Sequence, residues 1–290
     1  MPSFAQTLRK DVRAFCKALS ANSLDFALSN KGKRQRKCTK ALDVADIIVI
    51  LLLFQDSGFR RFKWFYEDYR GRHRLHKLPS YSWFLRLRKD VLLVFLHYLA
   101  FKLGEPTGLY YIDSTALPVC HNKRISQHKT FKNQAERGKT SVDWFYGFKL
   151  HMVINHLGQI VNVYFTKGNV DDRIGLDKMA EHLQGIICGD KGYISSEREK
   201  KLAEKGLKLL TKLRKNMKAK PLSKAEQRLL KRRAIIETVN GILKEVYVLA
   251  STKTRSILGF IILMISAITA YQINAINSMH HKGFPALTRT

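Results

Sequence analysis

Acidic residues are scarce in this chain. Its 290 residues include 23 Asp and Glu against 52 Lys and Arg, which gives a formal net charge of +29 at pH 7. A surplus of that size repels itself unless a polyanion neutralises it, and nucleic acid is the commonest polyanion in a cell. The charge therefore predicts a nucleic-acid partner, with a generally basic surface as the alternative. Hydrophobic residues at 45% and charged residues at 26% exclude a disordered or fibrous chain.

Cysteine is also scarce, and no two cysteines form a C-x-x-C pair. The four lie singly at Cys16, Cys38, Cys120 and Cys188. This spacing argues against a zinc module and a disulfide framework, and free thiols fit a reducing compartment. His121 and His128 lie in a basic loop, but no Cys or carboxylate has the spacing of a matching zinc ligand. The segment MPSFAQTLRKDVRAF has no apolar core of signal-peptide length, so we expect a cytoplasmic protein.

Long uncharged runs are rare, and only residues 256–276 could cross a bilayer by length. This run contains six polar residues, Ser256, Ser266, Thr269, Tyr271, Gln272 and Asn274. We predict a buried core helix and no membrane partner, with a membrane anchor as the alternative. The apolar run 47–54 is too short to span a bilayer and is predicted to be core.

The first third of the chain is predicted to be helical. Helices are expected at 41–55, 59–69 and 82–103, separated by Asp56-Ser57-Gly58 and Pro79-Ser80. Helix, short turn and helix form the outline of a helix-turn-helix, although any small helical bundle has the same outline. Residues 59–89 hold ten Lys and Arg against two acids. We therefore predict an all-α DNA-binding domain over 1–105.

The pattern changes after Pro106-Thr107-Gly108. Strands are predicted at 109–113, 144–154, 159–166, 185–190 and 207–213, and helices at about 173–184, 196–205 and 223–247. The order β-β-β-α-β-α-β-α predicts an α/β domain with one mixed sheet and helices on both faces, as in a ribonuclease-H-like fold. We expect this domain over 106–277, including a C-terminal core helix, and a tail over 278–290.

Three acids stand out in this basic domain. Asp113 ends the first strand and Asp190 ends the fourth, so both can point into one site, although either alone could be a turn residue. On the helix at 223–247, a rotation of 100° per residue places four polar residues on one face: Arg233, Glu237, Asn240 and Lys244. An exposed face with an Arg-Glu pair is the alternative for this helix.

Three carboxylates at one point repel each other unless cations lie between them. Their oxygens suit Mg²⁺ or Mn²⁺, and two such ions can act on the attacking and leaving oxygens of a phosphodiester. No Ser, Cys or His nucleophile is then needed. Asp171 and Asp172 are predicted to support the site or cap a helix rather than to be ligands.

Five motifs in order carry a resemblance to a known family. They are YYIDST (110–115), YGFKLHMVIN (146–155), GNVDD (168–172), GDKGY (189–193) and RRAIIETVNGILKE (232–245). They resemble insertion-sequence DDE transposases, and in particular the insertion-sequence 982 family. The resemblance implies that Asp113, Asp190 and Glu237 form the metal-binding triad. Arg233, Glu237 and Lys244 match the R-x3-E-x6-K part of a Y-R-E-K signature, but Leu230 stands where the Tyr is expected.

The resemblance also implies a reaction and its partners. Such enzymes bind the terminal inverted repeats of their element, hydrolyse phosphodiester bonds and join 3′-OH ends to target DNA. It implies Mg²⁺, with Mn²⁺ as a substitute and two ions in the site, a homodimer in the DNA complex, and a bacterial host. Only 47 residues separate Asp190 from Glu237, which leaves no room for a large inserted domain. A stand-alone nuclease and a non-catalytic DNA-binding descendant are the alternatives.

Two basic segments bear on DNA binding. Residues 198–233 hold 15 Lys and Arg against three acids, and we expect them to contact phosphates through Lys212, Arg214, Lys215 and Lys218. Residues 31–40 hold six Lys and Arg and form either a phosphate-binding arm or a solvated linker. Beside Glu237, we expect Arg233, Asn240 and Lys244 to contact the DNA near the scissile bond.

Overall fold

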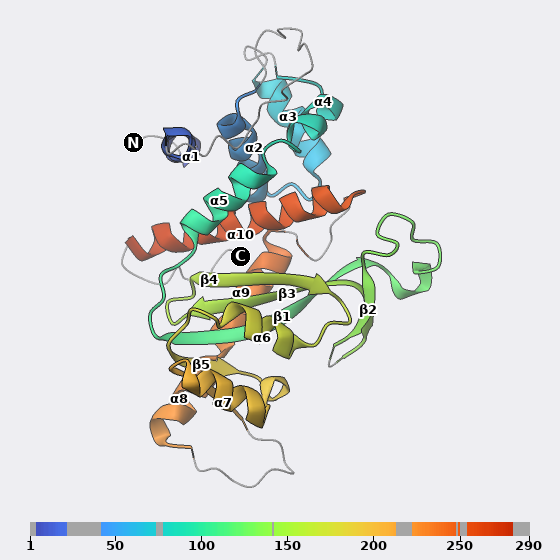
Figure 1. Cartoon of the computed structure of the whole chain (residues 1–290). Coiled ribbons are helices and arrows are strands. Elements are labelled where there is room, and N and C mark those ends of the chain that lie inside the picture. Colours follow the sequence, from blue (N-terminus) through green and yellow to red (C-terminus); the bar gives the residue numbers. More distant parts are fainter. Residues whose placement is uncertain are drawn as a thin grey trace. The chain divides into compact units, whose positions relative to one another are not determined.

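The computed structural model describes residues 4–21, 42–73, 78–140, 142–212, 222–247, 249 and 254–280. The chain divides into two compact units. The first comprises Met1–Lys102 with Leu258–Ala270, and the second comprises Leu103–Ile257 with Tyr271–Thr290. Figure 1 labels the elements of both.

The described part of the first unit is helical. Its elements are α1 (Phe4–Ala21), α2 (Val44–Asp56), α3 (Phe62–Arg72), α4 (Tyr81–Leu87), α5 (Leu92–Lys102) and part of α10 (Ile257–His280). Side chains cap two of the helices as their sequences favour, because Asp43 accepts from the N–H of Asp46 and Ser80 accepts from that of Trp83. A helix-turn-helix role for this unit stays a prediction.

Most aromatic side chains of α3 pack inside this unit. Phe65 and Tyr66 are buried, and the ring of Tyr66 lies 4.6 Å from that of Phe84. Phe62 lies 5.3 Å from Phe54 on α2. Trp64 differs, because 55% of its surface is exposed. The aromatic residues of this segment are therefore chiefly core residues.

Helix α10 is long and apolar enough to cross a membrane by length and composition. About two thirds (67%) of its most apolar window lies buried inside the protein. Within the first unit, Gln55 Nε2 donates a buried hydrogen bond of 2.6 Å to Ser266 Oγ. Burial of this extent, with a polar pair inside it, is typical of a core helix.

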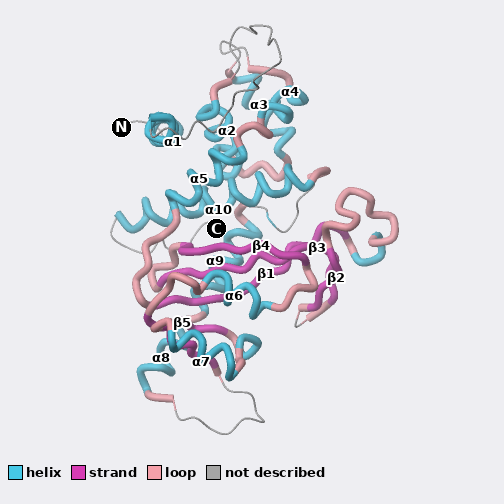
Figure 2. Tube along the Cα trace, viewed as in Figure 1, coloured by secondary structure: helices cyan, strands magenta, loops and turns pink. Residues whose placement is uncertain are grey.

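The second unit is built on a six-stranded sheet (Figure 2). The strands are β1 (Leu109–Cys120), β2 (Glu136–Lys139), β3 (Trp144–Asn155), β4 (Ile160–Lys167), β5 (Gly185–Gly189) and β6 (Leu207–Thr211). β1 lies between β3, to which it is antiparallel, and β5, to which it is parallel. β2 and β4 both pair antiparallel with β3, and β6 pairs parallel with β5. The predicted mixed sheet and the β3–β4 hairpin are confirmed.

Three details differ from the sequence-based expectation. β1 continues seven residues past Asp113, and its register shifts between Pro118 and Cys120, where a bulge tolerates the proline. β2 was not predicted, because its sequence ERGK has no apolar alternation. The helix expected over 223–247 is two helices, α8 (Lys224–Arg232) and α9 (Ala234–Glu245). The Arg233 N–H bonds to the Leu230 carbonyl three residues back, which tightens the chain between them.

Helices cover both faces of the sheet (Figure 1). On one face, α6 (Asp172–Met179), the short helix η3 (Lys191–Tyr193) and α7 (Ser196–Glu204) pack on a core that includes Tyr110 and Ile112 of β1. On the other face, α9 contacts β1. Side chains alternate along a strand, so Asp113 points away from the Tyr110 and Ile112 face and toward α9.

Candidate active site

Asp113 and Asp190 belong to two neighbouring parallel segments, Asp113 within β1 and Asp190 just after β5. β1 and β5 pair with Tyr111 opposite Cys188. Asp113 lies two residues further within β1, and Asp190 directly follows β5, which ends at Gly189. Adjacent strands are about 4.8 Å apart, and residues two apart face the same side. Asp190 keeps an extended backbone, and its side chain makes no capping hydrogen bond to η3 in the described chain. The parallel pairing of β1 and β5 therefore brings Asp113 and Asp190 to the same region of the sheet, and contact between their carboxylates stays a prediction.

Asn240 of α9 contacts the first of these acids. Its Nδ2 donates a hydrogen bond of 3.0 Å to Oδ2 of Asp113. Asn240 is 8% exposed, and its Oδ1 is buried without a hydrogen-bond partner among the residues described. A buried oxygen with a free lone pair beside a carboxylate adds to the oxygen-donor character of the site.

The carboxyl group of Asp113 has a pKa raised to about 6. Burial is the largest cause, and the negative charges of Glu237 and Asp172 act in the same direction. A backbone hydrogen bond from Ser114 and the positive charge of Arg233 partly oppose them. Several carboxylates thus lie near enough to disfavour each other's charge, a condition that a bound cation relieves.

The polar face of α9 is directed at Asp113. Arg233 Nη2 lies 2.5 Å from Glu237 Oε1, an i,i+4 ion pair in which the Glu237 side chain remains 56% exposed. Lys244 has a pKa lowered by burial and raised in part by the charge of Asp113. The four residues expected on one helical face therefore all act on Asp113, either directly or through their charge.

The oxygen donors present suit a hard divalent cation. No three His, Cys, Asp or Glu side chains of the described residues lie close enough together to hold a metal ion as they stand. The ion pair with Arg233 holds Glu237 at its present position. Convergence of Asp113, Asp190 and Glu237 on one ion stays a prediction.

A protein-family model described as "Transposase DDE domain" matches residues 103–257, more than half of the chain. The chain belongs to the DDE transposase domain family. Enzymes with this domain generally use divalent metal ions. No curated protein matches the chain. Among solved structures, it is similar to a piggyBac transposase in a synaptic complex with hairpin DNA, with 11% sequence identity and a TM-score of 0.47, over 94% of this chain and 74% of that one.

The transposase has a partly buried polar network that the sequence analysis missed. Lys149 Nζ lies 2.9 Å from both Asp172 Oδ1 and the Val170 carbonyl. His151 is fully buried, with Nε2 2.8 Å from Thr166 Oγ1 and Nδ1 3.9 Å from Asp172. The signal was present in the strand sequence, because Lys149 and His151 alternate with apolar residues and so share a face.

Asp171 and Asp172 have different roles in the transposase. Asp171 caps α6, accepting from the N–H of Arg173, and its ion pair with that side chain lowers its pKa to about 2. The predicted capping role is confirmed for Asp171. Asp172 instead pairs with Lys149 and contributes to the raised pKa of Asp113. It therefore belongs to the surroundings of the candidate site.

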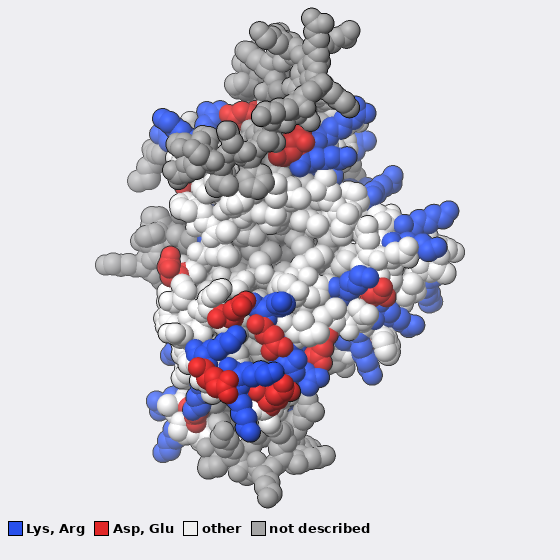
Figure 3. Space-filling view, viewed as in Figure 1, with Lys and Arg blue, Asp and Glu red and all other residues white. Residues whose placement is uncertain are grey.

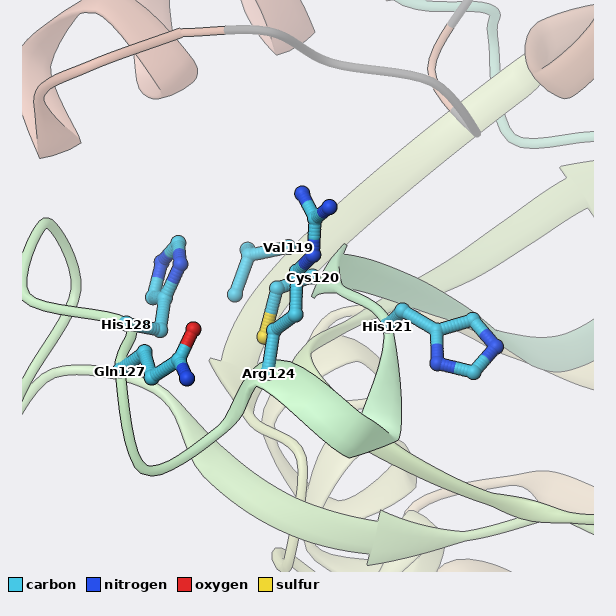
Figure 4. Close-up of a pocket in the computed structure, with 6 residues that line it drawn as sticks. All are labelled: Val119, Cys120, His121, Arg124, Gln127 and His128. Carbon is cyan, nitrogen blue, oxygen red and sulfur yellow. The ribbon is translucent and has the colours of Figure 1, made fainter.

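The loop after β1 forms an open pocket of about 500 Å³ (Figure 4). Its lining residues are Val119, Cys120, His121, Arg124, Gln127 and His128. The His121 ring points away from His128, so the two imidazoles do not converge on a zinc ion (Figure 4).

Of the phosphate-contacting residues expected beyond α7, Lys212 directly follows β6 and is exposed. Arg214, Lys215 and Lys218 lie outside the described residues, as does the basic segment 31–40.

Proposed function

We propose that this transposase serves an insertion sequence. It binds the terminal inverted repeats of its element, hydrolyses phosphodiester bonds at the element ends, and joins the freed 3′-OH ends to target DNA. The observation that carries this proposal is the contact of α9 with β1, where Asn240 meets Asp113. That contact brings the helix bearing Glu237 to the strand bearing Asp113, which is paired with the strand that Asp190 follows. The motifs that resemble the insertion-sequence 982 family support the assignment of the protein to that family.

The strand arrangement supports a ribonuclease-H-like catalytic domain. β4, β3 and β1 are antiparallel neighbours, and β5 and β6 continue the sheet in parallel with β1. In this arrangement the first and fourth predicted strands are adjacent, as a shared acidic site requires.

Asp113, Asp190 and Glu237 would hold two Mg²⁺ ions, for which Mn²⁺ can substitute. The ions, when bound, supply positive charge at the attacking and leaving oxygens of the phosphodiester. The protein's own side chains orient and balance this site. Asn240 fixes one oxygen of Asp113, and Arg233 holds Glu237. The charge of Lys244 stabilises negative charge that develops on the phosphate.

The partner is double-stranded DNA, both terminal repeats and target. The net charge of +29 attracts it, and contacts from Lys212 and the basic segment around it hold the phosphates. We propose that residues 1–105 read the element ends and that the enzyme acts as a homodimer on DNA in the bacterial cytoplasm.

The decisive experiment gives the full-length protein, with Mg²⁺, a duplex containing the DNA that flanks its coding region. We expect cleavage at the inverted repeats and joining of 3′ ends to a target plasmid. Asp113→Asn and Asp190→Asn should bind this DNA and cut none of it. Asp177→Asn is the matched control, because that acid pairs with Arg198 on the surface.

Cutting without joining would identify a nuclease, and binding without cutting would identify a non-catalytic protein. An Asp113→Asn variant that still cuts would exclude the metal mechanism.

A further inference from the structure

Residues 118–140 and 142–146 form a basic projection of the second unit, here called the basic arm. It contains the end of β1, the short helix η2 (Asn122–Arg124), β2 and the start of β3. Six basic side chains on it are exposed: Lys123, Arg124, Lys129, Lys132, Arg137 and Lys139. Within the part of the chain that the structure describes, none of the six forms an ion pair with an acid. Lys and Arg side chains gather over the region of β2 in Figure 3.

An exposed tryptophan lies among these cations. Trp144 begins β3 and is 46% exposed. It pairs with Lys139 of β2, whose Nζ lies 5.6 Å from the ring centroid, and Arg137 Cζ lies 5.2 Å from the same centroid. Phe145, the next residue, points the other way and is buried. Strand alternation therefore presents an indole ring and two cations together to solvent.

The backbone beneath this ring is held firmly. Asn122 Nδ2 donates to the Trp144 carbonyl, and the Trp144 N–H donates to Asp143 Oδ1, both at 2.7 Å. In β2, a Cβ atom at Gly138 would lie 2.1 Å from the Gly168 carbonyl oxygen, so only glycine permits this close packing. The ring is thus pre-positioned although nearly half of it faces water.

The pocket of Figure 4 adjoins this surface. The His128 ring lies 6.1 Å from that of Tyr146, which faces the same side of β3 as Trp144. His128 Nε2 is buried, with no hydrogen-bond partner among the described residues. Arg124 also lines the pocket. The arm therefore combines a stacking surface, cations and a polar recess.

We propose that the basic arm binds an unpaired stretch of a DNA strand, with one base stacked on Trp144. Arg137, Lys139 and Arg124 contact the phosphates on either side of that base. Stacking on a side chain needs an open base face, which a duplex interior does not offer, and an aromatic ring amid cations suits a single strand. This inference rests on the proposed DNA-processing function.

The arm also has a defined distance from the candidate active site. Met152 pairs with Asp113, and Trp144 precedes Met152 by eight residues on the same strand. At about 3.4 Å per residue, Trp144 lies at most about 27 Å from that position. The unpaired stretch is therefore expected within about eight nucleotides of the cleaved bond.

The test measures binding of the full-length protein, in EDTA, to a labelled single-stranded thymidine oligonucleotide and to a duplex of equal length. Trp144→Ala should weaken single-strand binding roughly 5- to 100-fold and change duplex binding less than about twofold. Trp144→Phe should retain most of the affinity. Arg137→Gln with Lys139→Gln should lower the single-strand salt slope by roughly 1 to 1.5. Lys178→Gln, at an exposed position of α6 outside the arm, is the matched control.

An equal loss of affinity for single-stranded and duplex DNA in Trp144→Ala would mean that the arm contacts phosphates only, and it would overturn the stacking proposal. Unchanged single-strand affinity in Trp144→Ala would overturn it as well. Neither result depends on cleavage, whereas the proposed function fails when the wild-type protein does not cut or join DNA. The two failures are therefore separate observations.

Discussion

Asn240 on α9 donates a hydrogen bond of 3.0 Å to Asp113 on β1, across 127 residues of sequence. The helical wheel placed Asn240 beside Glu237 as a DNA contact. The structure shows that its side chain is nearly buried and engaged with a carboxylate. It is therefore a positioning residue for Asp113 in the DNA-free protein, and a direct DNA contact by Asn240 stays a prediction.

Asn240→Ala should move the acid limb of the cleavage pH profile to higher pH. The hydrogen bond favours the charged carboxylate, so its loss should raise the pKa of Asp113 further above about 6. A bond to a charged group contributes about 1.5 kcal/mol, which corresponds to a shift of roughly one pH unit. Single-turnover cleavage between pH 5 and 9 measures it. Thr238→Ala, on the exposed side of the same helix, is the control, and an unmoved limb in Asn240→Ala would contradict the positioning role.

Asp113→Asn should stabilise the protein at neutral pH while it abolishes cleavage. The pKa of Asp113 is raised from 3.8 to about 6. The contribution of this carboxyl group to the free energy of unfolding is therefore most favourable below pH 4 and is lost as pH rises through 6. Asparagine removes the buried charge, and the free energy of unfolding at pH 7.5 should rise by about 2–3 kcal/mol. The gain should vanish at pH 4. Urea unfolding in EDTA at both pH values tests this, with exposed Asp190→Asn expected to change stability by less than about 0.5 kcal/mol.

His151 should make the fold sensitive to acid. Burial lowers its pKa from 6.5 to about 4, with Asp172 opposing the shift and Lys149 adding to it. Between pH 6.5 and 4 the His151 ring is protonated in the unfolded chain and neutral in the folded chain. The free energy of unfolding should therefore fall by about 3 kcal/mol as pH drops from 6.5 to 4. NMR titration should find this ring neutral at pH 5.5, while exposed His182 serves as the reference. A His151 that is protonated at pH 5.5 would refute the assignment.

Gly175→Ala offers an independent check on the packing around His151. A Cβ atom there would lie 2.6 Å from His151 Nδ1, so the substitution should destabilise the fold by about 1–3 kcal/mol. Gly192, whose Cβ would meet no atom within 4 Å, provides the control Gly192→Ala. Equal thermal midpoints for the two variants would show that the ring can move aside.

Arg233→Ala and Lys244→Ala should lower the cleavage rate more than DNA affinity. Arg233 holds Glu237, and the charge of Lys244 reaches Asp113, so both act where charge develops. We expect rates to fall by roughly 10²-fold and affinity by less than about threefold. Arg233→Lys should recover little of the cleavage rate, because lysine lacks the planar guanidinium. Lys231→Ala, exposed on α8, is the control, and parallel losses in rate and affinity would make these residues simple phosphate contacts.

Neutralising Lys212, Arg214, Lys215 and Lys218 together should weaken binding to all duplexes alike. Each phosphate contact adds about 0.9 to the slope of log affinity against log salt, so the slope should flatten by roughly two to four. Salt titrations with a terminal-repeat duplex and a scrambled duplex measure this. Loss of preference for the terminal repeat at an unchanged slope would mean that the segment reads sequence.

Much of the second unit could be predicted from local patterns. Apolar alternation located β3 and β4, and the short apolar runs before Asp190 and after Gly206 located β5 and β6. Asp113 and Asp190 were visible because acids that follow short apolar runs are conspicuous in a chain with a net charge of +29. Helical periodicity placed Arg233, Glu237 and Lys244 on one face, since that property depends only on spacing along one helix.

Other features depend on contacts between distant segments, which local periodicity does not encode. β2 is held in the sheet by its register with β3, and its own sequence has no strand pattern. Most aromatic residues of α3 are core because they pack against Phe84 and Phe54, which lie on other helices. Charge and the spacing of acids along the chain belong to the amino-acid sequence alone. The contact of Asn240 with Asp113, the burial of His151 and the exposure of Trp144 were decided by how helices and strands dock, because burial is a property of the assembled fold.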